Sequence, residues 1–193
     1  MPGFTLRGQF ANPAAIRRDL QPLRDLYTEK GYYNVEMDTD STVVDATNME
    51  DLVVTIREGK KVKVKTITFT GTDQLDPDDL RDAMEQGTTG FLRSGTFKKK
   101  QFEADEERIV TYCRNQGFLD AQVDEMRLDF REGREELDIV VDITEGPRYY
   151  MGEINWDGNT VFGDKVIADQ IFLQQGDVFK EDEYLETLND LQQ

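Results

Sequence analysis

Alternation of hydrophobic and polar positions predicts two similar pairs of strands along the chain. Residues 35–39 and 123–130 are each followed, after a connecting segment, by an apolar run at 52–56 or 139–143. These runs are rich in β-branched and other apolar residues, which favour pleated strands. Because the second pair lies 87 or 88 residues after the first, the same strand pair occurs twice.

Hydrophobic residues spaced three or four positions apart predict a helix before each strand pair, at 13–30 and at 101–116. The apolar faces are Ile16, Leu20, Leu23 and Tyr27 in the first helix, and Phe102, Ile109 and Cys113 in the second. The helices stop at Gly31 and Gly117, because a glycine adopts the left-handed conformation that ends a helix at little steric cost.

Shorter patterns complete a repeat. A helix is predicted at 76–84, where Asp76 caps and Pro77 takes the first helical position. Its counterpart is 164–172, and a further second helix begins at 181–193. Runs at 62–71 and 149–158 predict a strand that enters a glycine turn. The alternation breaks once in each run, which indicates either a connector joined to a strand or a bulge.

The order strand, helix, helix, strand, strand therefore repeats over about 87 residues. Residues 60–146 contain every element, whereas 1–59 begin near the second helix and 147–193 stop within it. We expect one complete domain at 60–146, flanked by the C-terminal part of one domain and the N-terminal part of another. Two helices packed on a three-stranded mixed sheet give an α+β fold. The ends are expected to be the boundaries of a piece and not natural termini.

The charge and composition of the chain exclude some classes of function. Forty acidic residues against 23 basic ones give a net charge of −17, which repels phosphate backbones and argues against nucleic acid as a partner. No apolar run reaches the roughly 20 residues that cross a bilayer, and the N-terminus lacks a signal-peptide pattern. The chain as given is expected to be soluble.

Catalytic and metal chemistry have little support. There is no histidine and a single cysteine, Cys113, so the commonest general base and zinc ligand is missing. Asp138 and Asp142 could serve as an acid and base pair, but their spacing places them on an exposed strand without a pocket. A calcium loop at 73–79 is interrupted by Pro77 and lacks the bidentate glutamate. We expect no enzyme, no cofactor and no metal.

The junctions between the repeats carry a family resemblance. The stretch from Glu145-Gly146-Pro147 to Trp156-Asp157-Gly158-Asn159 resembles the junction between consecutive POTRA domains, as does the stretch from Glu58-Gly59 to Gly71. The helix that ends at Gly117-Phe118 resembles the second helix of the same module. The similarity spans essentially the whole chain. It is greatest to the tandem POTRA domains in the periplasmic arm of BamA-type outer-membrane protein assembly factors.

This resemblance implies a function. The full protein would carry a C-terminal β-barrel, absent here, that anchors it in the outer membrane with this region on the periplasmic side. The region would receive unfolded outer-membrane proteins and dock other subunits of the assembly machine. POTRA regions of TamA-like or two-partner-secretion transporters, and a purely structural spacer arm, remain alternatives.

The route to client binding would be β-augmentation, in which an extended segment adds a strand to a sheet edge. In POTRA domains the second strand lies at an edge, which by position is 123–130 here. The charges on this strand could instead only guard the edge against aggregation. The candidate edge residues are Val123, Asp124, Glu125, Met126, Arg127 and Leu128.

The segment Glu145, Gly146 and Pro147 is predicted to form a restricted inter-domain joint, because proline fixes its φ while glycine permits unusual angles. Lysine clusters at 60–65 and 98–100 are interpreted as a solvated surface, with anionic headgroups or an acidic partner as the alternative. Trp156 and Cys113 are both expected in the core.

Self-association is expected of the incomplete flanking parts. Apolar residues at both ends would stay exposed, and such surface drives association. A second copy could then cover them, as in domain swapping. The residues concerned are Leu52, Val54, Ile56, Ile154, Trp156, Ile167 and Ile171.

Overall fold

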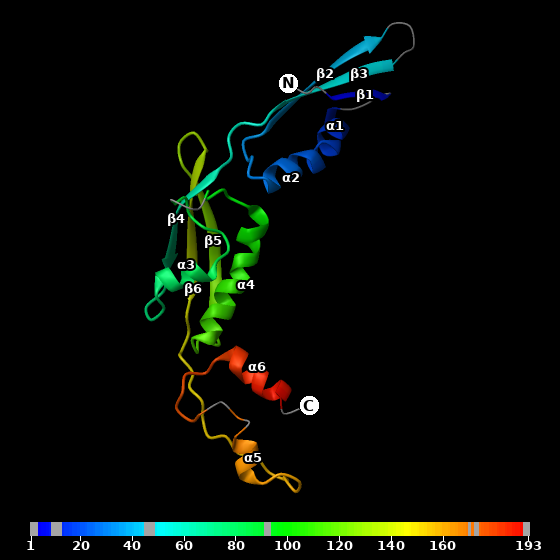
Figure 1. Cartoon of the computed structure of the whole chain (residues 1–193). Coiled ribbons are helices and arrows are strands. Elements are labelled where there is room, and N and C mark those ends of the chain that lie inside the picture. The colour runs from blue at the N-terminus through cyan, green and yellow to red at the C-terminus, as the bar shows by residue number, and fades with distance from the viewer. Residues whose placement is uncertain are drawn as a thin grey trace. The chain divides into compact units, whose positions relative to one another are not determined.

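The computed structural model describes residues 4–8, 13–44, 49–90, 94–169, 171 and 174–190. Pairs of helices separate groups of strands in an α+β arrangement (Figure 1). In chain order they are β1 (Phe4–Gly8), α1 (Pro13–Asp19), α2 (Gln21–Glu29), β2 (Glu36–Val44), β3 (Met49–Arg57), β4 (Lys63–Thr70), α3 (Pro77–Ala83), α4 (Lys99–Asn115), β5 (Gln122–Phe130), β6 (Glu136–Thr144), α5 (Asp164–Ala168) and α6 (Glu181–Asp190).

The chain divides into two compact units, which we describe separately. The first comprises residues 1–66, 86–103 and 128–139, and the second comprises 67–85, 104–127 and 140–193. The elements β4, α4, β5 and β6 contribute residues to both units. Residues 60–146 as an independent domain therefore remain a prediction.

The first unit contains a sheet with strand order β1-β3-β2. Both pairings are antiparallel, with Phe4 opposite Val54 and Glu36 opposite Arg57. The helix predicted at 13–30 is divided into α1 and α2. Pro22 explains the division, since it lies in the first turn of α2 and has no N–H to continue an earlier helix.

Strand β1 was not predicted, because five residues are too short for alternation to identify a strand. The exposure expected for Leu52 and Val54 is also wrong, as both side chains are only 3% exposed. They alternate with the exposed Val53 along β3, so their face of the strand is the buried one.

The other sheet has strand order β4-β6-β5. Thr66 donates through its hydroxyl to Asp138, and Thr70 donates in the same way to Asp142. Each pair is separated by 72 residues, and a constant separation indicates that β4 and β6 are parallel. At the turn between β5 and β6, the N–H of Arg131 donates to the carbonyl of Glu136 at 2.9 Å. The predicted mixed sheet is therefore present here, whereas the first sheet is antiparallel.

The alternation break predicted in the first strand of the repeat lies inside β4. Lys65 and Thr66 are both exposed, while Val64 and Ile67 on either side are buried. Because β4 continues through this break, the pattern is that of a bulge and not of a connector.

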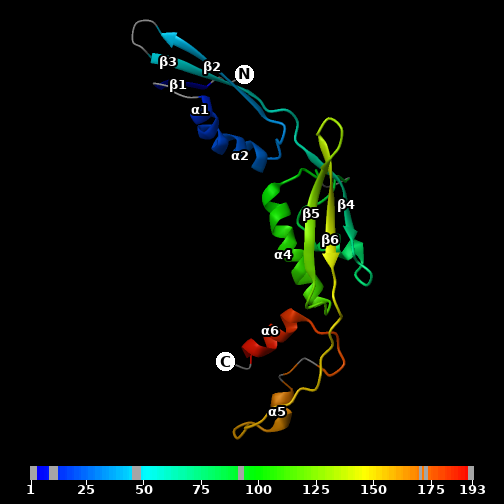
Figure 2. The ribbon, with the colours of Figure 1, turned by 180° about the vertical axis from the view of Figure 1, so that it is seen from behind.

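In the second unit, α3 and the part of α4 from Ala104 onward lie on the same face of the sheet (Figures 1 and 2). The N-terminus of α3 is as predicted, since the side chain of Asp76 accepts the N–H of Asp78 at 2.8 Å and Pro77 follows the cap. The core of this unit is made of Ile67, Phe69, Leu75, Leu80, Met84, Ile109, Cys113, Phe118, Ala121, Val141 and Ile143.

The strand predicted at 149–158 is not formed within the described part of the chain. Only an isolated bridge joins Tyr150 to Val178 there. Trp156 is 38% exposed and its indole N–H donates to Asp164, so its predicted place in the core is wrong. The helix predicted at 164–172 is the shorter α5, and residues 170, 172, 173 and 191–193 lie outside the described residues.

Candidate functional site

Strand β5, which contains the six candidate edge residues, is the last strand in the order β4-β6-β5. Val123, Met126 and Leu128 are half-buried, and the charged residues between them are exposed. Asp124 and Glu125 are exposed in succession, so the alternation shifts by one residue at this point. The strand thus has a half-buried apolar face and a charged outer face.

The charges on β5 have partners nearby. The hydroxyl of Thr144 donates to Asp124 at 2.6 Å, and Arg127 pairs with Glu125 at 3.5 Å. Exposed ion pairs of this kind contribute little to stability. Their position along a sheet edge suits both a guarded edge and a selective one.

The opposite edge of the sheet is already occupied where β4 begins. The N–H of Val64 donates to the carbonyl of Gly95 at 2.7 Å, and its carbonyl accepts the N–H of Thr89 at 3.0 Å. The carbonyl of Val62 accepts the N–H of Phe97 at 2.9 Å. The described residues of the segment 89–97 therefore use backbone groups that an added strand would need.

Gln86 fixes this covering segment. Its side chain is buried, donates to the carbonyl of Thr96 at 3.2 Å and accepts the N–H of Lys98 at 2.9 Å. A buried amide with these partners satisfies its own hydrogen bonds while holding both ends of a loop. The sequence pattern did not identify this residue.

Glu145, the first residue of the predicted joint, is buried and anchors the loop after β4. Its carboxylate accepts the backbone N–H groups of Asp73 at 2.9 Å, Gln74 at 3.1 Å and Leu75 at 2.9 Å. Gly146 follows with a φ of 70°, which is accessible to glycine at no steric cost. Pro147 is exposed.

Further contacts lie beside this joint. The N–H of Tyr149 donates to the carbonyl of Gly117 at 2.8 Å, and the carbonyl of Tyr149 accepts the N–H of Phe179 at 3.1 Å. The guanidinium of Arg148 lies 5.6 Å from the ring centroid of Phe118, within cation–π range. Hence Phe118, which follows the helix-ending Gly117, packs against Arg148, which follows Pro147.

The same contacts occur one repeat earlier, within the first unit. The N–H of Val62 donates to the carbonyl of Gly31 at 2.9 Å. The ammonium of Lys61 lies 5.3 Å from the ring centroid of Tyr32. The correspondence of Lys61 with Arg148 and of Tyr32 with Phe118, at 87 and 86 residues, was the signal that could have revealed this cation–π pair from sequence.

One contact differs between the surroundings of residues 58–62 and those of the predicted joint one repeat later, and we call these two places the first and the second joint. Glu29 and Lys100 form an ion pair at 2.8 Å in the first. In the second, the corresponding residues are Asn115, 86 residues after Glu29, and Asp182, which is the second residue of α6 as Lys100 is the second residue of α4. The side-chain oxygen of Asn115 accepts the N–H of Asp182 at 3.0 Å. The first joint therefore has a charge pair where the second has an amide at the N-terminus of α6.

Acidic side chains lie beside several members of the two lysine clusters. Lys60 pairs with Glu135 at 3.0 Å and Lys65 pairs with Glu136 at 3.6 Å. Lys99 pairs with Glu103 at 3.4 Å. These exposed pairs favour the interpretation of a solvated surface.

The potentially reactive groups are held in structural roles. Cys113 is 1% exposed, and burial followed by the nearby Glu145 charge raises the pKa of its thiol to about 11. Hydrogen bonds from Arg131 and Thr66 lower the pKa of Asp138 below 3.8. Within the described residues, no cluster of three metal-ligating side chains is present. No helix among them is long and apolar enough to cross a membrane.

The sequence matches known proteins along most of its length. The POTRA family, described as "Surface antigen variable number repeat", matches residues 5–59, 62–146 and 149–193. Outer membrane protein assembly factor BamA of Nitratidesulfovibrio vulgaris is 27% identical over 162 residues, which cover 82% of this chain and 20% of that protein. The BamA of Neisseria meningitidis serogroup B is 27% identical over 158 residues, which cover 80% of this chain and 20% of that protein.

A solved structure of Haemophilus influenzae BamA POTRA3-5 is 20% identical, with a TM-score of 0.48, over 96% of this chain and 71% of that one. The chain spans about a fifth of the length of the curated relatives it matches.

Proposed function

This chain belongs to the POTRA family, and on that premise we propose that it is part of the periplasmic POTRA region of a BamA-like outer-membrane protein assembly factor. In this proposal, β5 receives unfolded β-barrel clients by β-augmentation. The partners are unfolded outer-membrane proteins and other subunits of the assembly machine, and the protein's own β-barrel anchors the region at the outer membrane.

The difference between the two sheet edges carries the proposal. The backbone of Val62, just before β4, and of Val64 in β4 is bonded to Thr89, Gly95 and Phe97. At the other side of the sheet, β5 is the last strand in the order. An added strand gains its affinity from backbone hydrogen bonds and depends little on side-chain identity. This suits a receiver of many clients with different sequences.

The hydrogen bond at the β5–β6 turn indicates which backbone N–H groups of β5 point away from β6. Arg131 donates its N–H toward β6, and backbone groups alternate in direction along a strand. The N–H of Leu128, an odd number of residues away, is therefore expected to point to the open edge. Its side chain is half-buried, so a client would meet the backbone and the neighbouring charges.

A structural spacer arm is the second candidate function, favoured by the repetition of the joint contacts at Gly31 and Gly117. Two joints with the same contacts would fix the direction of successive repeats and hold a barrel at a distance from its partners. A spacer of this kind would not touch clients.

Site-specific photocrosslinking in cells distinguishes the two functions. A crosslinker at the exposed Arg127 or Asp129 of β5 should capture unfolded outer-membrane proteins, and the capture should increase when barrel assembly is blocked. The matched control is the same crosslinker at Glu106, exposed on α4. Capture of clients at neither position would leave the spacer as the function, and capture at Glu106 alone would contradict client binding at β5.

A further inference from the structure

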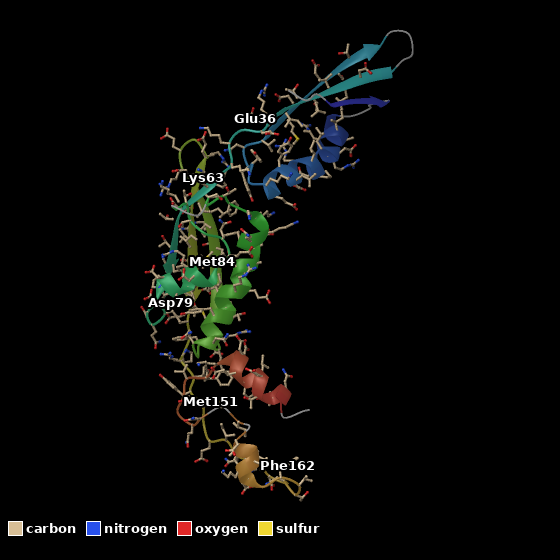
Figure 3. All side chains as sticks on the ribbon, viewed as in Figure 1. Glu36, Lys63, Asp79, Met84, Met151 and Phe162 are labelled. Atoms are coloured by element: carbon tan, nitrogen blue, oxygen red, sulfur yellow. The ribbon has the colours of Figure 1, made fainter. Side chains whose placement is uncertain are left out.

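The start of β4 is paired with a short segment of the first unit, residues 94–97, which we call the edge segment. Thr96 forms an antiparallel bridge with Lys63, the first residue of β4 (Figure 3). Beside this bridge, the N–H of Val64 donates to the carbonyl of Gly95 at 2.7 Å. The edge segment therefore has the hydrogen bonds of a short strand added to the sheet.

Phe97 anchors the edge segment. Its backbone N–H donates to the carbonyl of Val62, just before β4, at 2.9 Å. Its side chain is fully buried, with ring centroids 5.0 Å from Tyr33 and 5.5 Å from Phe102. Because an aromatic side chain of this size is costly to expose, the anchor holds the segment against the strand.

Gly95 lets the edge segment approach closely. Its φ is 56°, and a Cβ there would lie 2.3 Å from the backbone nitrogen of Thr89. That nitrogen donates its own hydrogen to the carbonyl of Val64 at 3.0 Å. A side chain at position 95 would therefore force either Thr89 or the edge segment away from the strand.

The same arrangement recurs one repeat later, within the second unit, where residues 176–179 are the counterpart segment. Tyr150 forms an antiparallel bridge with Val178. The N–H of Met151, which Figure 3 labels, donates to the carbonyl of Asp177 at 2.8 Å. The second repeat thus has both the bridge and the bond beside it.

The remaining bonds have counterparts as well. The N–H of Phe179 donates to the carbonyl of Tyr149 at 3.1 Å, and the N–H of Gly176 donates to the carbonyl of Met151 at 2.9 Å. The edge segment and its counterpart share only their final phenylalanine. Since the same bonds form with different side chains, the closure is a backbone property of the repeat.

Each segment also packs against the glycine that ends a helix. A Cβ on Gly31 would lie 2.5 Å from Thr96 Cγ2, and a Cβ on Gly117 would lie 2.8 Å from Val178 Cγ1. Both segments are therefore confined between a strand and a glycine, which leaves no room for a further strand in the same place.

We propose that the edge segment is a built-in strand that closes the start of β4, and that its release uncovers a second acceptor edge for an extended peptide. The incoming strand would take over the N–H of Val64 and the carbonyl of Val62. Both valines are fully buried, and an open edge of such residues pairs unselectively. The consequence that clients are received at β5 alone rests on the proposed function.

Two replacements release the edge segment by different routes. G95V places a side chain where only glycine fits, and Q86A removes the amide that binds the backbone of Thr96 and Lys98. In both variants the amide of Val64 should exchange its hydrogen at least about tenfold faster. The matched control is G90A, where a Cβ meets no atom within 4 Å. Circular dichroism establishes that each variant is folded.

Isothermal titration calorimetry then counts the molecules of a synthetic strand peptide, taken from an outer-membrane β-barrel protein, that each chain binds. G95V and Q86A should each bind one peptide more than wild type and G90A. The same peptide with all its amides N-methylated lacks backbone donors and should not give this extra binding. If the proposed function is wrong, wild type binds no peptide while G95V still binds one, so the two proposals fail separately.

Three results would overturn the closure of β4 by the edge segment. The first is that neither G95V nor Q86A binds an extra peptide. The second is that the N-methylated peptide binds equally well, which would mean side-chain recognition. The third is that the amide of Val64 stays as protected in both variants as in wild type, since the edge segment would then not depend on the contacts described.

Discussion

The backbone N–H of Tyr149 donates to the carbonyl oxygen of Gly117 over 2.8 Å. Gly117 has a φ of 90° and ends α4, while Tyr149 begins the next repeat. The end of one repeat's second helix is thereby bonded to the start of the following repeat. Val62 and Gly31 make the same bond one repeat earlier, at 2.9 Å.

Replacement G117A should destabilise the second unit by about 1–3 kcal/mol. A Cβ there would lie 2.8 Å from Val178 Cγ1 and 2.9 Å from the carbonyl oxygen of Tyr149, at a strained φ. Urea unfolding measures the loss. The matched control is G152A, where a Cβ meets no atom within 4 Å. Equal stability of the two variants would mean that this joint contributes nothing.

Replacement E145Q should cost about 1–3 kcal/mol in the free energy of unfolding. The amide retains one acceptor oxygen, whereas the carboxylate binds the N–H groups of Asp73, Gln74 and Leu75. Hydrogen exchange of these three amides should accelerate in the variant. The exposed Glu106 provides the control as E106Q, and unchanged exchange in E145Q would contradict the role given to the carboxylate.

The stability of the fold should depend on pH through Asp138. Because Arg131 and Thr66 lower its folded pKa below 3.8, the contribution is present above about pH 4 and is lost as the pH falls through the folded pKa. The stability difference between wild type and D138N, about 0.5–1 kcal/mol at pH 6 for a partly exposed pair, should shrink toward pH 2.

A double-mutant cycle with R131Q isolates the main cause of this pH dependence. In the R131Q background, D138N should change stability by less than in wild type, and with a weaker pH dependence. If the effect of D138N on stability stayed constant from pH 6 to pH 2, both in wild type and in R131Q, the pH dependence would not come from Asp138.

Cys113 should resist alkylation in the folded protein. Its thiol pKa of about 11 against an ordinary 9.0 lowers the thiolate fraction at pH 8 about a hundredfold, and the thiolate is the reactive form. Burial lowers the rate further. The rate of iodoacetamide labelling, compared with that in urea, measures the effect, and equal rates would show that the thiol is accessible.

The parts of the fold that the sequence predicted depend on local signals. Asp76 and Pro77 set the start of α3, and Gly117 ends α4 because only a residue that tolerates positive φ fits there. Strand β1 was missed because its five residues act only through pairing with β3. Trp156 was wrongly predicted to be buried, because its correspondence with Phe69 in the repeat does not supply the partner strand that would cover it.

The candidate site also has features that the sequence predicts and others that it does not. The apolar and charged alternation of β5 is visible in sequence, and the structure has it with a shift at Asp124 and Glu125. The loop that covers β4 depends on Gln86 and Gly95, which carry no periodic signal. The sequence therefore does not show that backbone groups at the start of β4 are already bonded, and the structure does.

Strand pairing at β5 is tested most directly by the affinity for a synthetic strand peptide of an outer-membrane β-barrel protein, measured by fluorescence anisotropy with L128P and L128A. Both variants must first show the wild-type fold. Proline removes the backbone donor expected at the open edge, so L128P should bind about five- to tenfold more weakly than L128A, the worth of one hydrogen bond. Equal affinities of L128P and L128A would contradict backbone pairing at β5.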